Sequence, residues 1–168
     1  MAYLVPIQKR YYNNPEASAK AFKEDGYYRT GDYFVVDDDG YYQYRGRMSD
    51  RIRTKGHTFP PAYLEDLWIH QYSDDIKECC VVGAFSKRLG YELPRAYVVL
   101  VENSKKDQQA FIDGLVSYVN SRAPQAEMQL SGGAKCLKKL PLTNSYKVDR
   151  YKLRGIAQEE INKPSARL

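Results

Sequence analysis

The chain has 168 residues, of which 43% are apolar and 28% charged, and its formal net charge is +5. This composition is typical of a packed globular chain of one ordinary domain. The apolar runs are only a few residues long, so the sequence predicts no membrane span. The first residues lack the basic flank and long apolar stretch of a secretory signal.

The basic residues and the cysteines argue against two further classes of site. Lys and Arg are scattered without a zinc-finger or RNA-recognition pattern, so we expect no nucleic-acid partner. The cysteines Cys79, Cys80 and Cys136 are odd in number, and His57 and His70 lie at no ligand spacing to them. We therefore expect no disulfide framework, no metal site, and a reduced intracellular protein with buried thiols.

The predicted elements of the first half are short. In chain order they are a helix over 16–22 and strands over 33–36 and 41–44, joined by a hairpin turn at Asp39-Gly40. An extended piece over 51–54 then ends at Gly56. The prolines in 58–61 predict a helix start, and apolar residues at 64, 67 and 68 give that helix one buried face.

The second half alternates strands and helices. Strands are expected over 78–84 and 96–101, a helix over 106–121, a strand over 134–140 and a helix over 149–161. The whole pattern predicts an α+β fold, in which a small sheet is flanked by helices and preceded by a β-hairpin.

The first of three polar groups that can carry chemistry is Tyr28-Arg29-Thr30-Gly31-Asp32. Gly31 permits a tight turn, and the carboxylate of Asp32 can accept hydrogen bonds from the two vicinal hydroxyls of a ribose. The alternative is an ordinary turn in a connecting loop.

The second group is the basic segment 44–56. If the chain is extended here, alternation places Arg47, Ser49, Arg51, Arg53 and Lys55 on one side, and the following glycine marks a sharp turn or a close approach. Such a stripe can hold a nucleotide. It can equally be a charged edge strand that resists aggregation.

The third group is the polar segment 140–150, which runs into the last predicted helix. An ammonium at Lys147 can lie between a carboxylate and a phosphate and reduce their repulsion. The alternative is a lysine that is merely solvated.

In this order, the motifs Tyr-Arg-Thr-Gly-Asp, Gly-Arg-x-x-Asp-x-Ile-Arg-x-x-Gly and Pro-Leu-Thr-x-Ser-x-Lys-Val-Asp-Arg resemble the C-terminal half of the adenylate-forming (AMP-binding) superfamily. The branch of acyl-CoA synthetases, 4-coumarate–CoA ligases and luciferases fits best. The resemblance runs from Tyr11 to about Ile161. It implies the tail end of a large N-terminal domain over 1–46, a C-terminal lid domain over 47–162 and a flexible tail over 163–168.

The resemblance also implies an activity, in which a carboxylate attacks ATP to give acyl-AMP, and CoA then forms the thioester. Its substrates are ATP, with Mg²⁺ held by the N-terminal domain, and CoA. The implied roles are catalysis by Lys147, nucleotide binding by Asp32, Arg47 and Thr30, a hinge at Ser49 and Asp50, and a CoA path along Arg53, Lys55 and Gly56.

Two positions depart from the family pattern. Ser49 stands where the hinge residue is usually Asp or Lys, and Tyr146 stands where Gly usually precedes the catalytic lysine. The phosphate loop, acyl pocket and metal-holding glutamate of the family belong to an N-terminal domain that this sequence lacks. We therefore expect a truncated product, isoform or fragment that is incomplete alone and partners a separate N-terminal domain or a full-length paralogue. The alternative is a non-catalytic paralogue that acts as a protein-binding or regulatory module.

The last three residues, Ala166-Arg167-Leu168, resemble the small–basic–Leu address that the peroxisomal import receptor reads. The sequence therefore predicts a peroxisomal location and that receptor as a partner. The alternative location is the cytoplasm.

Overall fold

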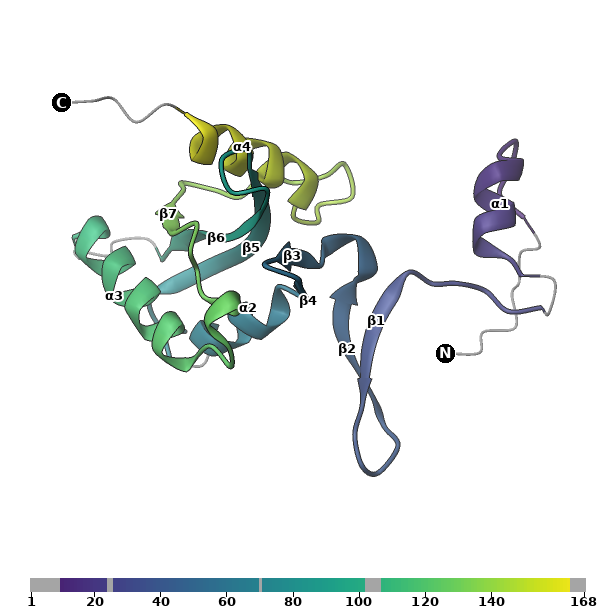
Figure 1. The fold of residues 1–168 in the computed structure, drawn as a ribbon, viewed down its shortest axis with the longest axis horizontal. Helices are drawn as coiled ribbons and strands as arrows, with labels where there is room; N and C mark the ends of the chain where they lie inside the picture. The colour runs from purple at the N-terminus through teal and green to yellow at the C-terminus, as the bar shows by residue number, and fades with distance from the viewer. Residues whose placement is uncertain (1–9, 24–25, 70, 102–106, 164–168) are drawn as a thin grey trace. The chain divides into compact units, whose positions relative to one another are not determined.

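The computed structural model describes residues 10–23, 26–69, 71–101 and 107–163 (Figure 1). The chain forms two compact units, Met1–Ser49 and Asp50–Leu168. The assignment of 1–46, 47–162 and 163–168 to three parts of a larger enzyme stays a prediction.

The first unit contains the helix α1 (Pro15–Ala21) and a β-hairpin of β1 (Asp32–Val36) and β2 (Tyr42–Arg47). The Asn14 side chain caps α1 by accepting a hydrogen bond from the Ala17 amide at 3.0 Å. In the hairpin turn, Gly40 has a φ of 85°, which favours glycine. The hairpin predicted around Asp39-Gly40 is confirmed.

A short 3-10 turn, η1 (Met48–Asp50), spans the boundary between the two units, and the second unit continues into a second hairpin of β3 (Ile52–Thr54) and β4 (His57–Phe59). The expected helix start at 58–61 is wrong, because residues 57–59 pair with β3 and α2 (Ala62–Ile69) begins only after Pro60 and Pro61. The expected single-sided stripe over 47–55 is also wrong. The 3-10 turn and the left-handed backbone of Lys55 (φ 45°) break the strand alternation.

The centre of the second unit is a three-stranded sheet in the order β5-β6-β7. Its strands are β5 (Ile76–Ser86), β6 (Tyr91–Leu100) and β7 (Ala134–Cys136); β6 is antiparallel to β5 and parallel to β7. The first two strands are longer than predicted, because their hairpin turn takes only four residues. The third is shorter than the predicted 134–140.

Helices cover both faces of this sheet (Figure 1). The helices α2 and α3 (Gln108–Arg122) lie on one face, and α4 (Arg150–Asn162) lies on the other. Alternation along β5 sends Val81 into the α2–α3 core with Trp68 and Leu115, and sends Val82 into the α4 core with Leu153. A short 3-10 turn, η2 (Ala126–Met128), precedes β7. The predicted α+β class is confirmed.

The described part of the chain has no helix that is both long and apolar enough to cross a bilayer. Nor does it bring three or more His, Cys, Asp or Glu side chains together as a metal site would require.

Candidate functional site

The first unit brings the three predicted nucleotide-binding residues together. Asp32 and Arg47 are cross-strand partners at the ends of β1 and β2, and their side chains form an ion pair of 2.9 Å. The guanidinium of Arg47 also donates to the Thr30 carbonyl at 2.6 Å, and the Thr30 hydroxyl accepts from the Asp32 amide at 3.1 Å. Hairpin register therefore holds a half-buried carboxylate beside a cation.

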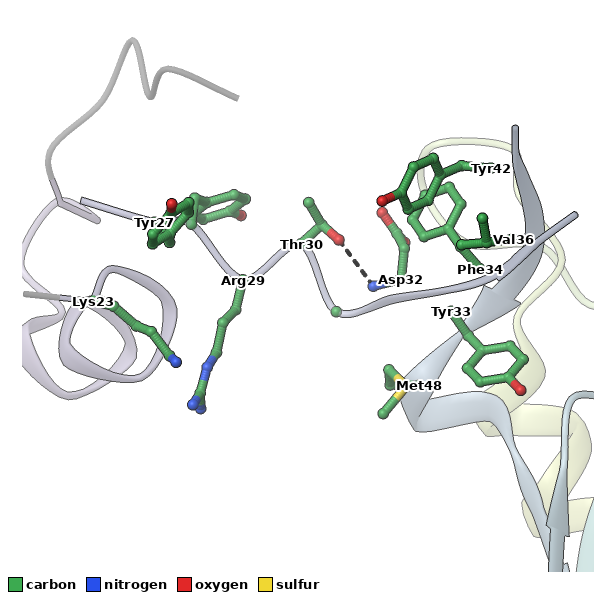
Figure 2. A pocket seen from close by; sticks show the side chains of 12 residues that line it. Lys23, Tyr27, Arg29, Thr30, Asp32, Tyr33, Phe34, Val36, Tyr42 and Met48 are labelled. Carbon is green, nitrogen blue, oxygen red and sulfur yellow. Dashed lines mark hydrogen bonds between the residues drawn. The ribbon is translucent and has the colours of Figure 1, made fainter. Parts of the chain in front are cut away.

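Two of these residues, Thr30 and Asp32, line a pocket of about 520 Å³ that lies within the first unit. The rings of Phe34 and Tyr42 line the same pocket (Figure 2). Gly31, between Thr30 and Asp32, has a φ of 74°, and Arg47 lies 3.8 Å from where its Cβ would be. A carboxylate, a hydroxyl and aromatic faces in one pocket suit a sugar joined to a planar base.

The junction of the two units falls between Ser49 and Asp50, the two predicted hinge residues. They end the 3-10 turn η1, which follows β2 directly. The Met48 amide before them donates to the Gly31 carbonyl at 2.8 Å, so the first unit holds this turn at its start. The hinge role itself stays a prediction.

The predicted catalytic lysine lies at the end of a closed loop that precedes α4. The Thr143 amide donates to the Lys147 carbonyl at 2.8 Å, and the Lys147 amide donates back to the Thr143 hydroxyl at 3.3 Å. An isolated bridge between Leu142 and Val148 closes the loop. The side chain of Lys147 is exposed. The backbone is therefore fixed, while the ammonium extends into solvent.

Tyr146, at the position where the resemblance leads us to expect glycine, keeps a glycine-like backbone. Its φ is 59°, in the left-handed region that L-residues rarely adopt, and its side chain is 87% exposed. The bulky ring therefore does not push the loop aside. It instead leaves the backbone strained by about 1–2 kcal/mol.

Below this loop, Arg150 and Glu65 pair across the free edge of the sheet. Arg150 begins α4 and Glu65 belongs to α2; their guanidinium and carboxylate meet at 2.9 and 3.0 Å. Glu65 accepts from the Val81 amide at 2.7 Å, and Arg150 donates to the Val81 carbonyl at 2.9 Å. The pair thus satisfies the outward backbone groups of edge strand β5 as a neighbouring strand would.

Arg150 also contacts one of the predicted hinge residues, since its Nε lies 3.7 Å from a carboxylate oxygen of Asp50. Burial opposes the charged guanidinium, but the adjacent Glu65 carboxylate outweighs it and raises the pKa of Arg150. A permanent cation therefore links the base of the Lys147 loop to the predicted hinge. The third sequence motif ends at Arg150, but nothing in its local spacing reveals that this residue meets Glu65.

The predicted CoA-path residues lie on the β3–β4 hairpin. Arg53 is exposed on β3, and Lys55 and Gly56 form its two-residue tip. The ammonium of Lys55 lies 6.0 Å from the centre of the Tyr91 ring. The predicted targeting residues Ala166, Arg167 and Leu168 lie outside the described residues.

Comparisons with known proteins show which family and fold the chain resembles. Residues 71–147 match the family of the AMP-binding enzyme C-terminal domain. A probable 4-coumarate–CoA ligase of Dictyostelium discoideum is 37% identical over 103 residues, which are 61% of this chain and 18% of that protein. A luciferin 4-monooxygenase of Photuris pensylvanica is 32% identical over 158 residues, or 94% and 27% of the two chains.

Solved structures of the same kind superpose on most of the chain. An anthranilate CoA ligase in complex with anthranoyl-AMP matches with a TM-score of 0.77 and 26% identity, over 90% of this chain and 28% of that one. The o-succinylbenzoate CoA synthetase of Bacillus subtilis, solved with its acyl-adenylate intermediate, matches with a TM-score of 0.69 and 27% identity, over 87% and 28%.

The fold and the ordered motifs are therefore those of the adenylate-forming superfamily. The chain belongs to the C-terminal part of that superfamily, and its relatives are 4-coumarate–CoA ligases, luciferases and acyl-CoA synthetases. It spans only 18–27% of the length of the curated relatives described above.

Proposed function

We propose that this chain supplies the lid part of an ATP-dependent acid–CoA ligase and acts with an N-terminal adenylation domain. The observation that carries the proposal is the cluster of Thr30, Asp32 and Arg47 beside one pocket, followed along the chain by a solvent-facing Lys147. The chain's similarity to 4-coumarate–CoA ligases supports it, as does the fold shared with a ligase bound to anthranoyl-AMP.

In the first half-reaction, a substrate carboxylate attacks the α-phosphate of ATP, which forms acyl-AMP and releases pyrophosphate. Asp32 accepts hydrogen bonds from the ribose hydroxyls, and Arg47 steadies that carboxylate and reaches the ribose. The ammonium of Lys147 reduces the repulsion between the attacking carboxylate and the phosphate. We assign the Mg²⁺ that accompanies ATP to the N-terminal domain.

In the second half-reaction, the CoA thiol attacks the acyl carbonyl, and the bond to AMP breaks. We assign the change between the two steps to rotation about Ser49 and Asp50, which lie at the junction of the two compact units. Rotation withdraws Lys147 and brings in the β3–β4 hairpin with Arg53, Lys55 and Gly56. A hinge between two compact bodies can turn with little change inside either of them.

A complementation assay tests the proposal. The full chain is mixed with a 4-coumarate–CoA ligase truncated before its own C-terminal domain, and pyrophosphate release and thioester formation are measured separately. We expect the chain to restore both reactions. Lys147→Ala then lowers pyrophosphate release by about 100-fold or more, since loss of one group that stabilises developing charge has this effect. It leaves thioester formation from supplied acyl-AMP near the parent level.

The matched control is Lys152→Ala, which removes another exposed lysine only five positions along the chain. It should leave both half-reactions unchanged. Equal pyrophosphate release by the Lys147→Ala chain and its parent would refute the assigned role.

Titration of the isolated chain with ATP tests whether its site is incomplete. The chain offers ribose contacts but no phosphate loop, so we expect no binding in the micromolar range. Micromolar affinity, lost in Asp32→Asn, would contradict the need for a second domain.

For location, we propose import into peroxisomes through Ala166-Arg167-Leu168. Imaging a chain tagged at its N-terminus, with and without these three residues, decides this. The same cytosolic distribution for both would end the proposal.

A further inference from the structure

The β3–β4 hairpin is too small to hold its own position. Each strand has three residues, and the tip residues Lys55 and Gly56 have φ values of 45° and 83°, as in the tight type I′ turn. Two-stranded hairpins are marginally stable by themselves. One side is anchored, because Ile52, Thr54 and Phe59 are buried.

The other side of the hairpin is anchored by one carboxylate. Residues along an antiparallel strand direct their backbone N–H groups alternately toward and away from the partner strand. Thr54 flanks the two-residue turn, and the residue before it, Arg53, directs its N–H away from β4. This N–H donates to Oε2 of Glu92 at 2.7 Å. A hydrogen bond to an ionised carboxylate is stronger than one between neutral groups.

The carboxylate of Glu92 reaches Arg53 by passing over a glycine in the neighbouring strand. Glu92 pairs with Phe85, and Gly83 lies two residues before Phe85 in β5. A Cβ at Gly83 would lie 2.5 Å from Oε2 of Glu92 and 3.2 Å from Cγ2 of Ile52. No φ requirement explains this glycine, so its role is space: it leaves room for both contacts that hold the hairpin.

We propose that Glu92 is the positioning residue that fixes the β3–β4 hairpin on the sheet, and that Gly83 is the gap through which it acts. The tip of this hairpin carries Lys55 and Gly56, so Glu92 sets where the proposed CoA path lies; this last step rests on the proposed function. The acidic side chain at position 92 thus acts on the site through the backbone of Arg53 and touches no substrate itself.

Amide hydrogen exchange and amide chemical shifts of the full chain, measured by NMR without substrate, test the proposal. In Glu92→Ala, we expect the Arg53 amide to exchange about tenfold faster or more, the scale of losing a hydrogen bond to a charged group. Its proton resonance should also move upfield. Glu92→Gln keeps a neutral acceptor of the same size and reach, so both changes should be smaller than in Glu92→Ala but still measurable. A merely space-filling role predicts no change in Glu92→Gln, because the two side chains have nearly the same volume.

Gly83→Ala should reproduce the faster exchange without altering Glu92, because the new methyl group displaces the carboxylate. In the Glu92→Ala background, the same substitution should change Arg53 exchange by no more than about twofold, since the two act through one contact. The controls are Gly155→Ala, where a Cβ meets nothing within 4 Å, and Glu159→Ala on the exposed side of α4.

The proposal is overturned if Arg53 exchange in Glu92→Ala stays within about twofold of the parent, or if β5 and β6 lose protection to the same degree. Should Gly83→Ala not fold, the Glu92 series decides alone. No ATP, CoA or second domain enters the measurement. A failed ligase assay therefore leaves this result standing, and a negative exchange result leaves the role of Lys147 untouched.

Discussion

Loss of the Glu65 carboxylate should destabilise the second unit more than loss of any exposed charge. Glu65→Ala removes both hydrogen bonds from Arg150 and the acceptor of the Val81 amide. Removing one partner of a fully buried ion pair costs about 3–5 kcal/mol. Here the side chains of Arg150 and Glu65 remain 27% and 13% exposed, so water compensates in part and we expect about 2–3 kcal/mol.

For a unit of this size, such a loss lowers the melting temperature by roughly 10 °C. Thermal unfolding followed by circular dichroism, together with urea unfolding, measures the change. Glu159→Ala on α4 is the matched control, because its carboxylate is exposed and its effect should stay within about 0.5 kcal/mol.

A double-mutant cycle separates the pair from its surroundings. Glu65→Ala leaves a half-buried cation without its main partner, so adding Arg150→Met should cost much less than the sum of the two single changes. Additive losses, or a Glu65→Ala chain within about 0.5 kcal/mol of the parent, would refute the view that this pair closes the edge of β5.

Three further predictions follow from other parts of the second unit. Tyr146→Gly should stabilise it by up to about 1 kcal/mol in urea unfolding, because relief of left-handed strain exceeds the entropy that glycine costs. Burial opposes the charge of Glu160, but hydrogen bonds from Lys135, Tyr97 and Arg95 outweigh it and lower the pKa of that carboxyl. The stabilisation from this carboxylate is therefore fully present above the ordinary pKa of 4.5 and is lost as the pH falls through the lowered pKa. Glu160→Gln should therefore destabilise the unit at pH 7, and its deficit relative to the parent should shrink as the pH is lowered below 4.5. Burial also raises the pKa of the Cys80 thiol to about 12, so iodoacetamide at pH 8 should label it only when urea unfolds the chain; fast labelling of the native protein would contradict this.

The sequence by itself determined the local features of this protein. The turn at Asp39-Gly40, the apolar faces of the helices and the ordered motifs follow from residues close together in the chain, and they were enough to indicate the superfamily. Local signals also misled: Pro60 and Pro61 suggested a helix that starts at 58, whereas residues 57–59 form β4 and the helix begins at Ala62. Left-handed Lys55 followed by Gly56 folds that segment back on β3 instead.

Only the tertiary structure decided which polar groups meet. Arg150 pairs with Glu65, which lies 85 positions away in the sequence, and the amide of Arg53 donates to Glu92, which lies 39 positions away. Such pairs depend on sheet register and on helices packed against opposite faces, which local propensity does not encode. The role of Gly83 depends on the same register, because this glycine leaves space for the side chain of Glu92, which comes from the neighbouring strand.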